Sequence, residues 1–147
     1  MTVQSRARQA SPLEVWEEAH RFVKVYDLEG FAGMFAQAGV LEMPFAPAGM
    51  PKHIEGRDNI RRVLGAAGER SRRAGRRIVS YSSVVVHETT NPEVIIVEFD
   101  LNGEVSATKE TYMLSYIQVM RVRDGEIVFF RDYMNPAALA ALPGVGG

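Results

Sequence analysis

The chain contains no cysteine among its 147 residues. Disulfides, thiolate metal sites and a cysteine nucleophile are therefore all excluded. An excess of charge of one sign is also missing, because 17 lysines and arginines balance 18 aspartates and glutamates to leave a formal net charge of -1. Such a chain has no overall attraction to nucleic acid or to an anionic membrane. Partners must therefore be sought in local features.

Long hydrophobic runs are absent as well. No stretch approaches the roughly 18 apolar residues of a membrane span, and the N-terminal "MTVQSRARQASP" lacks the apolar centre of a signal peptide. We therefore expect a soluble, cytoplasmic protein with no membrane partner.

The length and composition fit one globular domain. A hydrophobic content of 46% with 24% charged residues is typical of a globular chain, and 147 residues are enough to close one core but few for two. We expect a single domain over residues 1–147, with its core at about 12–142.

Helices are predicted to precede the strands. "SPLE" at Ser11 to Glu14 is typical of a capping box that starts a helix running to about Tyr26. Asp27 then caps a second helix that continues to Ala38, with Gly39 as its stop. "GRDNIRRVLGAAG", residues 56–68, repeats apolar residues at helical spacing and predicts a third helix.

Strands are predicted for most of the rest. A short one covers residues 40–45, and from residue 76 onward four segments rich in β-branched and aromatic residues alternate with turn signals such as Asp124-Gly125. Helices followed by a meander indicate an α+β domain, with the helices on one side of a curved, mainly antiparallel sheet.

The last predicted strand carries the most informative motif, "GEIVFFRDYMNP". Period-two alternation places Asp132 on one face with Phe130, and Arg131 on the other with Phe129. A carboxylate in an apolar wall is costly unless it is paired or used. Because both faces are largely apolar and helices cover only one, we also predict a homodimer packed through the sheet.

A pocket is expected on the concave face of the sheet. If the even-numbered residues face it, Glu98, Asp100 and Asp132 gather there, and the repulsion and lost solvation raise the pKa of at least one of them. A neutral and an ionised carboxyl side by side could serve as general acid and base. Five further residues are expected to bind an apolar small molecule beside these acids: Tyr116, Gln118, Leu114, Phe130 and Met134.

The order of elements and the ending "RDYMNP" followed by "LAALPGV" resemble the SnoaL-like branch of the ketosteroid isomerase and nuclear transport factor 2 superfamily. The similarity is greatest to the phenazine-biosynthesis A/B proteins, with "REFMNP" at this place, and to limonene epoxide hydrolase, with "WRDYFD". The resemblance covers about residues 12 to 142. It implies a cone-shaped fold of three helices on a curved sheet, with Asp132 as the acid/base carboxylate.

The other functional residues of these relatives match this sequence less well. Asp100 matches the second aspartate of the epoxide hydrolase, but Glu98 replaces its bridging arginine and Glu42 its water-positioning asparagine. The general base of ketosteroid isomerase falls on Met43. The resemblance therefore disfavours steroid isomerisation and that mechanism of epoxide opening.

Other readings stay open for several residues. Asp132 could form a salt bridge or bond the loop at Asn135, and Glu98 and Asp100 could face solvent. His53 lies in a glycine-rich loop that could cover a pocket mouth or simply the surface, and Trp16 is expected to reach the pocket from the first helix.

The arginines of residues 70–77 invite a nucleic-acid interpretation. We expect a solvated basic turn instead, because no aromatic residues are interleaved with them. Three scattered histidines likewise indicate no metal site.

The leading hypothesis is a small-molecule enzyme of secondary-metabolite type, without a cofactor. It would carry out acid/base chemistry, such as isomerisation, cyclisation or dehydration, on a hydrophobic, oxygen-bearing substrate. The alternatives are a dimeric module that only binds a small ligand, and an epoxide hydrolase with a rearranged carboxylate set.

Overall fold

The structure is a computed structural model that describes residues 9–143; residues 1–8 and 144–147, including most of the N-terminal stretch discussed above, lie outside the described residues. The elements in chain order are α1 (Pro12–Lys24), α2 (Leu28–Ala32), β1 (Phe35–Glu42), β2 (His53–Glu55), α3 (Arg57–Arg73), β3 (Arg76–Glu88), β4 (Val94–Val105), β5 (Thr111–Arg123), β6 (Glu126–Met134) and α4 (Pro136–Ala140).

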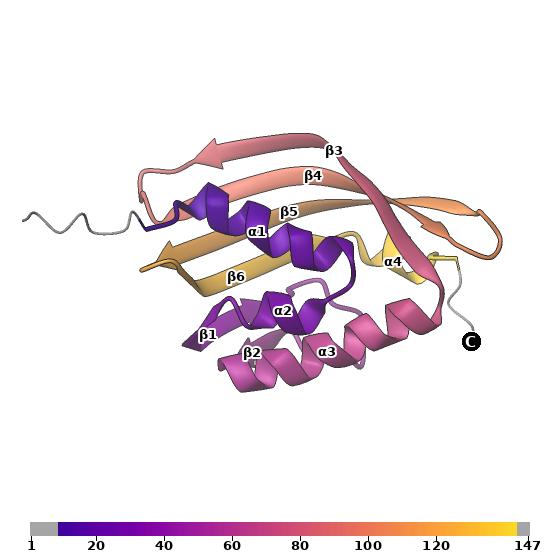
Figure 1. Cartoon of the computed structure of the whole chain (residues 1–147), viewed down its shortest axis with the longest axis horizontal. Helices are drawn as coiled ribbons and strands as arrows, with labels where there is room; N and C mark the ends of the chain where they lie inside the picture. The colour runs from indigo at the N-terminus through magenta and orange to yellow at the C-terminus, as the bar shows by residue number, and fades with distance from the viewer. Residues whose placement is uncertain (1–8, 144–147) are drawn as a thin grey trace, which may run out of the picture.

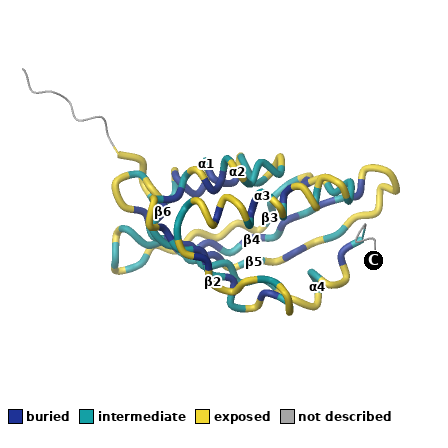
Figure 2. Tube along the Cα trace, turned by 90° about the horizontal axis from the view of Figure 1, so that it is seen from below, coloured by how far each residue is buried: buried dark blue, intermediate teal, exposed yellow. Residues whose placement is uncertain are grey.

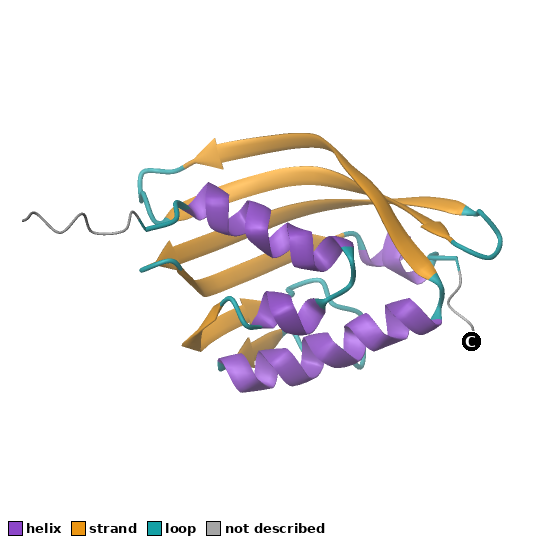
Figure 3. Cartoon of the chain, in the orientation of Figure 1, coloured by secondary structure: helices purple, strands orange, loops and turns teal. Residues whose placement is uncertain are grey.

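The strands form one six-stranded sheet in the order β2-β1-β6-β5-β4-β3. All neighbours are antiparallel except β1 and β6, which run parallel. Figures 1 and 3 show α1, α2 and α3 together on one side of the curved sheet. The predicted α+β class and the four-stranded antiparallel meander are confirmed.

Local signals start the helices as predicted. The Ser11 hydroxyl accepts from the amide of Glu14, and the Glu14 carboxylate accepts from the amide of Ser11. Asp27 caps α2 by accepting from the amide of Gly30. None of the helices within residues 9–143 is long and apolar enough to span a membrane.

The predicted extent of the second helix is wrong. It ends at Ala32, and residues 35–38 belong to β1, whose Phe35 pairs with Ile127 of β6. Pairing with β6 overrides the helical spacing of the apolar residues. Gly39 is not a helix stop but lies at a register shift of β1, where an added Cβ would meet two carbonyl oxygens at 3.0 Å.

The buried residues lie mainly between the helices and the sheet (Figure 2). On the sheet side they include Val97, Phe99 and Leu101 of β4, which are at most 6% exposed. The odd-numbered residues of β4 thus face the helices. Because Val97 lies directly opposite Gln118, and Gln118 opposite Asp132, odd residues of β4 share a face with even residues of β5 and β6.

Candidate active site

Arg131 and Asp132, adjacent in the sequence, have different surroundings. Glu42 lies beside Arg131 in the parallel register of β1 and β6, and its Oε1 accepts from Nε and Nη2 of Arg131 at 3.0 and 2.9 Å. Asp132 instead lines a cavity beneath the helices. The strand therefore delivers the guanidinium to a partly exposed ion pair and the carboxyl group to the interior.

The cavity has a volume of about 190 Å³. Most of its wall is apolar, with contributions from the helices, the sheet and the C-terminal segment. Its apolar lining includes Phe31, Leu41, Met43, Leu64, Leu114, Phe130, Leu139 and Leu142. An apolar hollow with a few polar groups suits a small, mainly apolar molecule.

Gln118 connects Asp132 to two residues of α1. Trp16 donates its indole Nε1–H to Oε1 of Gln118 at 2.9 Å, and Nε2 of His20 lies 2.9 Å from the same oxygen. Since an indole N–H can only donate, this amide atom is the oxygen, and His20 must donate to it through Nε2–H. The amide nitrogen is thereby directed at Asp132, to whose Oδ1 it donates at 3.2 Å.

Burial raises the pKa of Asp132 from 3.8 to about 7, while the hydrogen bond from Gln118 acts in the opposite direction. Asp132 is partly accessible. Its accessible surface faces the cavity, where a small ligand can reach it, rather than bulk solvent. A carboxyl group with a pKa near neutral pH can both accept and return a proton.

The imidazole of His20 is neutral near pH 7. Burial lowers its pKa from 6.5 to about 4, despite the hydrogen bond to Gln118. Its Nδ1 is buried and has no hydrogen-bond partner among the described residues. With Nε2 donating to Gln118, this nitrogen is an acceptor that a hydroxyl group or a water molecule could satisfy.

Tyr116 offers a donor beside Asp132. Its ring stacks on Phe99 at 5.3 Å between centroids, with 14° between the planes. Burial, with a smaller contribution from the charge of Asp132, raises the pKa of Tyr116 above its ordinary range. The phenol therefore stays protonated, and it makes no hydrogen bond to another described residue, so it can donate to a ligand oxygen.

The structure brings most of the expected pocket residues together. Leu114, Tyr116, Gln118, Phe130 and Asp132 line the cavity. Trp16 was expected to reach the pocket but does not line it. It lies behind Gln118, to whose side chain it donates a hydrogen bond. Met134 lies opposite Tyr116 and packs against the core, but it borders a second, larger hollow rather than this cavity.

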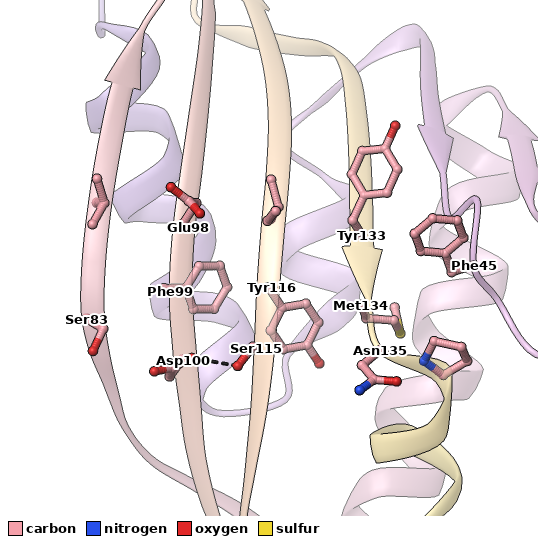
Figure 4. Close-up of a pocket in the computed structure, with 13 residues that line it drawn as sticks. Phe45, Ser83, Glu98, Phe99, Asp100, Ser115, Tyr116, Tyr133, Met134 and Asn135 are labelled. Carbon is pink, nitrogen blue, oxygen red and sulfur yellow. Dashed lines mark hydrogen bonds between the residues drawn. The ribbon is translucent and has the colours of Figure 1, made fainter.

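The expectation that Glu98 and Asp100 join Asp132 is wrong. They are even-numbered residues of β4 and lie on the outer face of the sheet. Glu98 lies 2.6 Å from Nε2 of His87, and Asp100 accepts from the Ser115 hydroxyl at 2.7 Å (Figure 4). They line an open hollow of about 660 Å³ on that face. We place the candidate active site in the smaller cavity because its described lining contains Asp132, an acid removed from bulk solvent.

Glu42 and His53 are also outside the cavity. Nδ1 of His53 lies 3.0 Å from Glu42, and its Nε2 lies 3.0 Å from Glu55. The hydrogen bonds from His53 and Arg131 lower the pKa of Glu42. These residues form a surface cluster at the junction of β1, β2 and β6, so substrate contacts are not expected from them.

Several cavity residues were not predicted. Sequence reasoning did not assign Tyr26 to the pocket and placed Arg76 in a solvated basic turn, yet both line the cavity, as do His20 and Tyr112. The position of His20 on the stripe of Trp16 was the one available signal, since residues four apart share a helix face. Within residues 9–143, no cluster of three or more potential ligands could hold a metal ion.

A model of the SnoaL-like domain family matches residues 16–130. The chain belongs to this family. A PhzA/B-like protein of Pseudomonas aeruginosa is 33% identical over 133 residues, which is 90% of this chain and 90% of the relative. The SnoaL-like and phenazine-type resemblance in the sequence is thus confirmed.

Solved structures support the same SnoaL-like fold. A Bacillus subtilis protein described as a candidate isomerase aligns with a TM-score of 0.70 and 29% identity, covering 88% of this chain and 92% of that one. A candidate polyketide cyclase from Xanthomonas campestris aligns with a TM-score of 0.66 and 17% identity, over 88% of this chain and 94% of its own. The second likeness concerns the fold alone.

Proposed function

We propose that this SnoaL-like protein is a cofactor-free enzyme that moves a proton on a small, mainly apolar, oxygen-bearing substrate. The observation that carries the proposal is the placement of Asp132, whose carboxyl group lines an apolar cavity, has a pKa of about 7 and is oriented by Gln118. Isomerisation, cyclisation and dehydration all need such a proton transfer, and a relative at 29% identity is described as a candidate isomerase.

The roles follow from the contacts. Asp132, when ionised, takes a proton from a carbon next to a carbonyl group, and the C–H electron pair passes into the enolate. Tyr116 donates its hydroxyl hydrogen bond to the oxygen that gains charge, because that hydroxyl makes no bond to another described residue. Protonated Asp132 then returns the proton to the same or another carbon. The proton removed by Asp132 is returned and the electron pair stays within the substrate, so the reaction needs no oxidant or reductant.

Hydrogen–deuterium exchange tests this role without the natural substrate. A panel of small apolar ketones in D₂O is followed by NMR for deuterium at carbons next to the carbonyl group. We expect exchange above the buffer rate, reduced on the order of 100-fold in Asp132→Asn. Asp100→Asn, on the outer face, is the matched control and should exchange normally. Normal exchange by Asp132→Asn would refute the role of Asp132.

A module that only binds a ligand is the second candidate. It is favoured because Asp132 is the single carboxyl group among the described residues that line the cavity, since Asp100 and Glu98 lie elsewhere. The same observation weighs against a rearranged epoxide hydrolase, which needs a second acid near Asp132. Incorporation of oxygen-18 from water into a diol would reveal that third activity.

We also propose that a second copy of the chain covers the outer face of the sheet. Val85 and Ile117 are 47% and 43% exposed and line the open hollow. Tyr133 and Phe45 line it as well (Figure 4). An exposed apolar surface of this kind is typical of an interaction site.

A further inference from the structure

Among the residues that the structure describes, two charged side chains line the cavity, Asp132 and Arg76. Arg76 begins β3, directly after α3. Its Nε is buried and has no hydrogen-bond partner, and no ion pair to it exists among the described residues. Buried donors without a partner are uncommon and call for an explanation.

The neighbouring arginine shows what is unusual here. Arg77 lies opposite Glu104 of β4 and forms an ion pair with it at 3.2 Å. Arg76 lies opposite Val105, which offers no charge. Two consecutive arginines therefore differ in that one has an acidic partner within the protein and the other lines the cavity without one.

The surroundings of Arg76 are polar and open to a ligand. Tyr26 and Tyr112 line the cavity on this side, with 3.2 Å between their hydroxyl oxygens. Arg76 is close enough to Tyr26 for its charge to oppose the rise in that residue's pKa caused by burial. Arg76, Tyr26 and Tyr112 are all partly exposed, whereas His20 and Gln118, the neighbours of Asp132, are buried.

An alternative task for Arg76 would be to neutralise the C-terminal end of α3. The last turn of that helix already contains Arg70, Arg72 and Arg73. That end is therefore well supplied with positive charge. It gives no reason for a fourth guanidinium to face the cavity.

We propose that Arg76 binds a carboxylate group of the substrate, so that the cavity accepts an apolar carboxylic acid. This inference rests on the proposed function of the same cavity. The carboxylate lies at the partly exposed end, beside Tyr26 and Tyr112, and the reacting carbon lies at Asp132. A guanidinium can donate Nε–H and one Nη–H to the two oxygens of a carboxylate, which satisfies the unpartnered Nε.

Binding of a matched pair of probes tests the proposal. Cyclohexanecarboxylate and cyclohexanecarboxamide share an apolar ring and differ mainly in charge. Calorimetric titration at about pH 6, where Asp132 is neutral because its pKa is about 7, should show the carboxylate binding at least about tenfold more tightly. The fluorescence of Trp16, the single tryptophan, reports occupation of the cavity through its bond to Gln118.

The variants locate the effect. Arg76→Gln should abolish the preference for the carboxylate, whereas Arg77→Gln and Asp132→Asn should keep it. Equal affinity of the wild-type protein for both probes, or failure to bind either, would overturn the proposal, as would a preference that survives in Arg76→Gln. The wild-type comparison stands even if a variant is unstable. Because no turnover is measured, the result is independent of the exchange assay on Asp132.

Discussion

Gln118 and Asp132 lie directly opposite each other on β5 and β6, and the amide nitrogen of Gln118 donates to the carboxyl group at 3.2 Å. The other end of the same amide is held by Trp16 and His20 of α1. One glutamine therefore links the first helix of the chain to the acid on its last strand. The position of the proposed catalytic group depends on how the helix packs on the sheet.

Replacing Gln118 by leucine should be costly. The indole N–H of Trp16 and the Nε2–H of His20 would both lose their buried acceptor, at about 1–3 kcal/mol each. Urea unfolding should show a free energy of unfolding lower by about 2–5 kcal/mol. Gln37→Leu, at an exposed position of β1, is the control and should change it little. A loss no greater than that of the control would contradict the proposed hydrogen-bond network.

The stability of the protein should depend on pH through Asp132. Its pKa is about 7 in the folded protein against 3.8 when exposed, so the folded state holds the proton more tightly. Its contribution to stability is present below about pH 4 and is lost as the pH rises to about 7. The Asp132→Asn variant has no carboxyl group here and therefore does not lose this stability as the pH rises. Relative to wild type, its free energy of unfolding should therefore rise by on the order of 4 kcal/mol between these pH values.

His20 has the opposite dependence. Because burial lowers its pKa from 6.5 to about 4, the unfolded chain binds the proton more tightly and stability rises with pH over that interval. The two residues partly cancel in the wild-type protein. Denaturant titrations of His20→Gln should therefore show stability falling more steeply with pH than wild type. An unchanged slope would show that His20 is not buried as a neutral ring.

Gly103 should not tolerate a side chain. It lies opposite Tyr112, and an added Cβ would come within 2.3 Å of the tyrosine ring. Gly103→Ala should displace this ring from Tyr26 and lower the free energy of unfolding by about 1–3 kcal/mol. In a Tyr112→Ala background the same change should cost clearly less, and a double-mutant cycle measures the difference. Equal costs in the two backgrounds would exclude the ring as the cause.

The outer face of the sheet should control the oligomeric state. If a second copy covers the hollow, Ile117→Lys places a charge in the interface and should shift the protein toward monomer in sedimentation velocity at micromolar concentration. Val25→Lys is the control, because Val25 is 70% exposed at the end of α1, away from that face. A wild-type protein that sediments only as a monomer would contradict the proposed dimer.

Local chemistry in the sequence was sufficient for several elements. The Ser11–Glu14 capping box, the Asp27 cap and the Asp124–Gly125 turn act within a few residues, so their patterns can be interpreted directly. Asp132 could be selected because a charged residue in an apolar strand must be paired or used. Period-two alternation also separated it correctly from Arg131.

The amino-acid order thus defined the α+β class, the meander and the acid on the last strand, because these depend on periodicity and short-range contacts. Tertiary pairing decided the rest. The register of β4 with β5 decides whether odd- or even-numbered residues of β4 face the helices. It places Glu98 and Asp100 on the outer face of the sheet. Pairing with β6 made a strand of residues 35–38. Packing of α1 on the sheet and pairing of the start of β3 with β4 brought His20 and Arg76 to the same cavity. The spacing of His20 from Trp16 indicates a shared helix face, but no spacing along the chain encodes these long-range contacts.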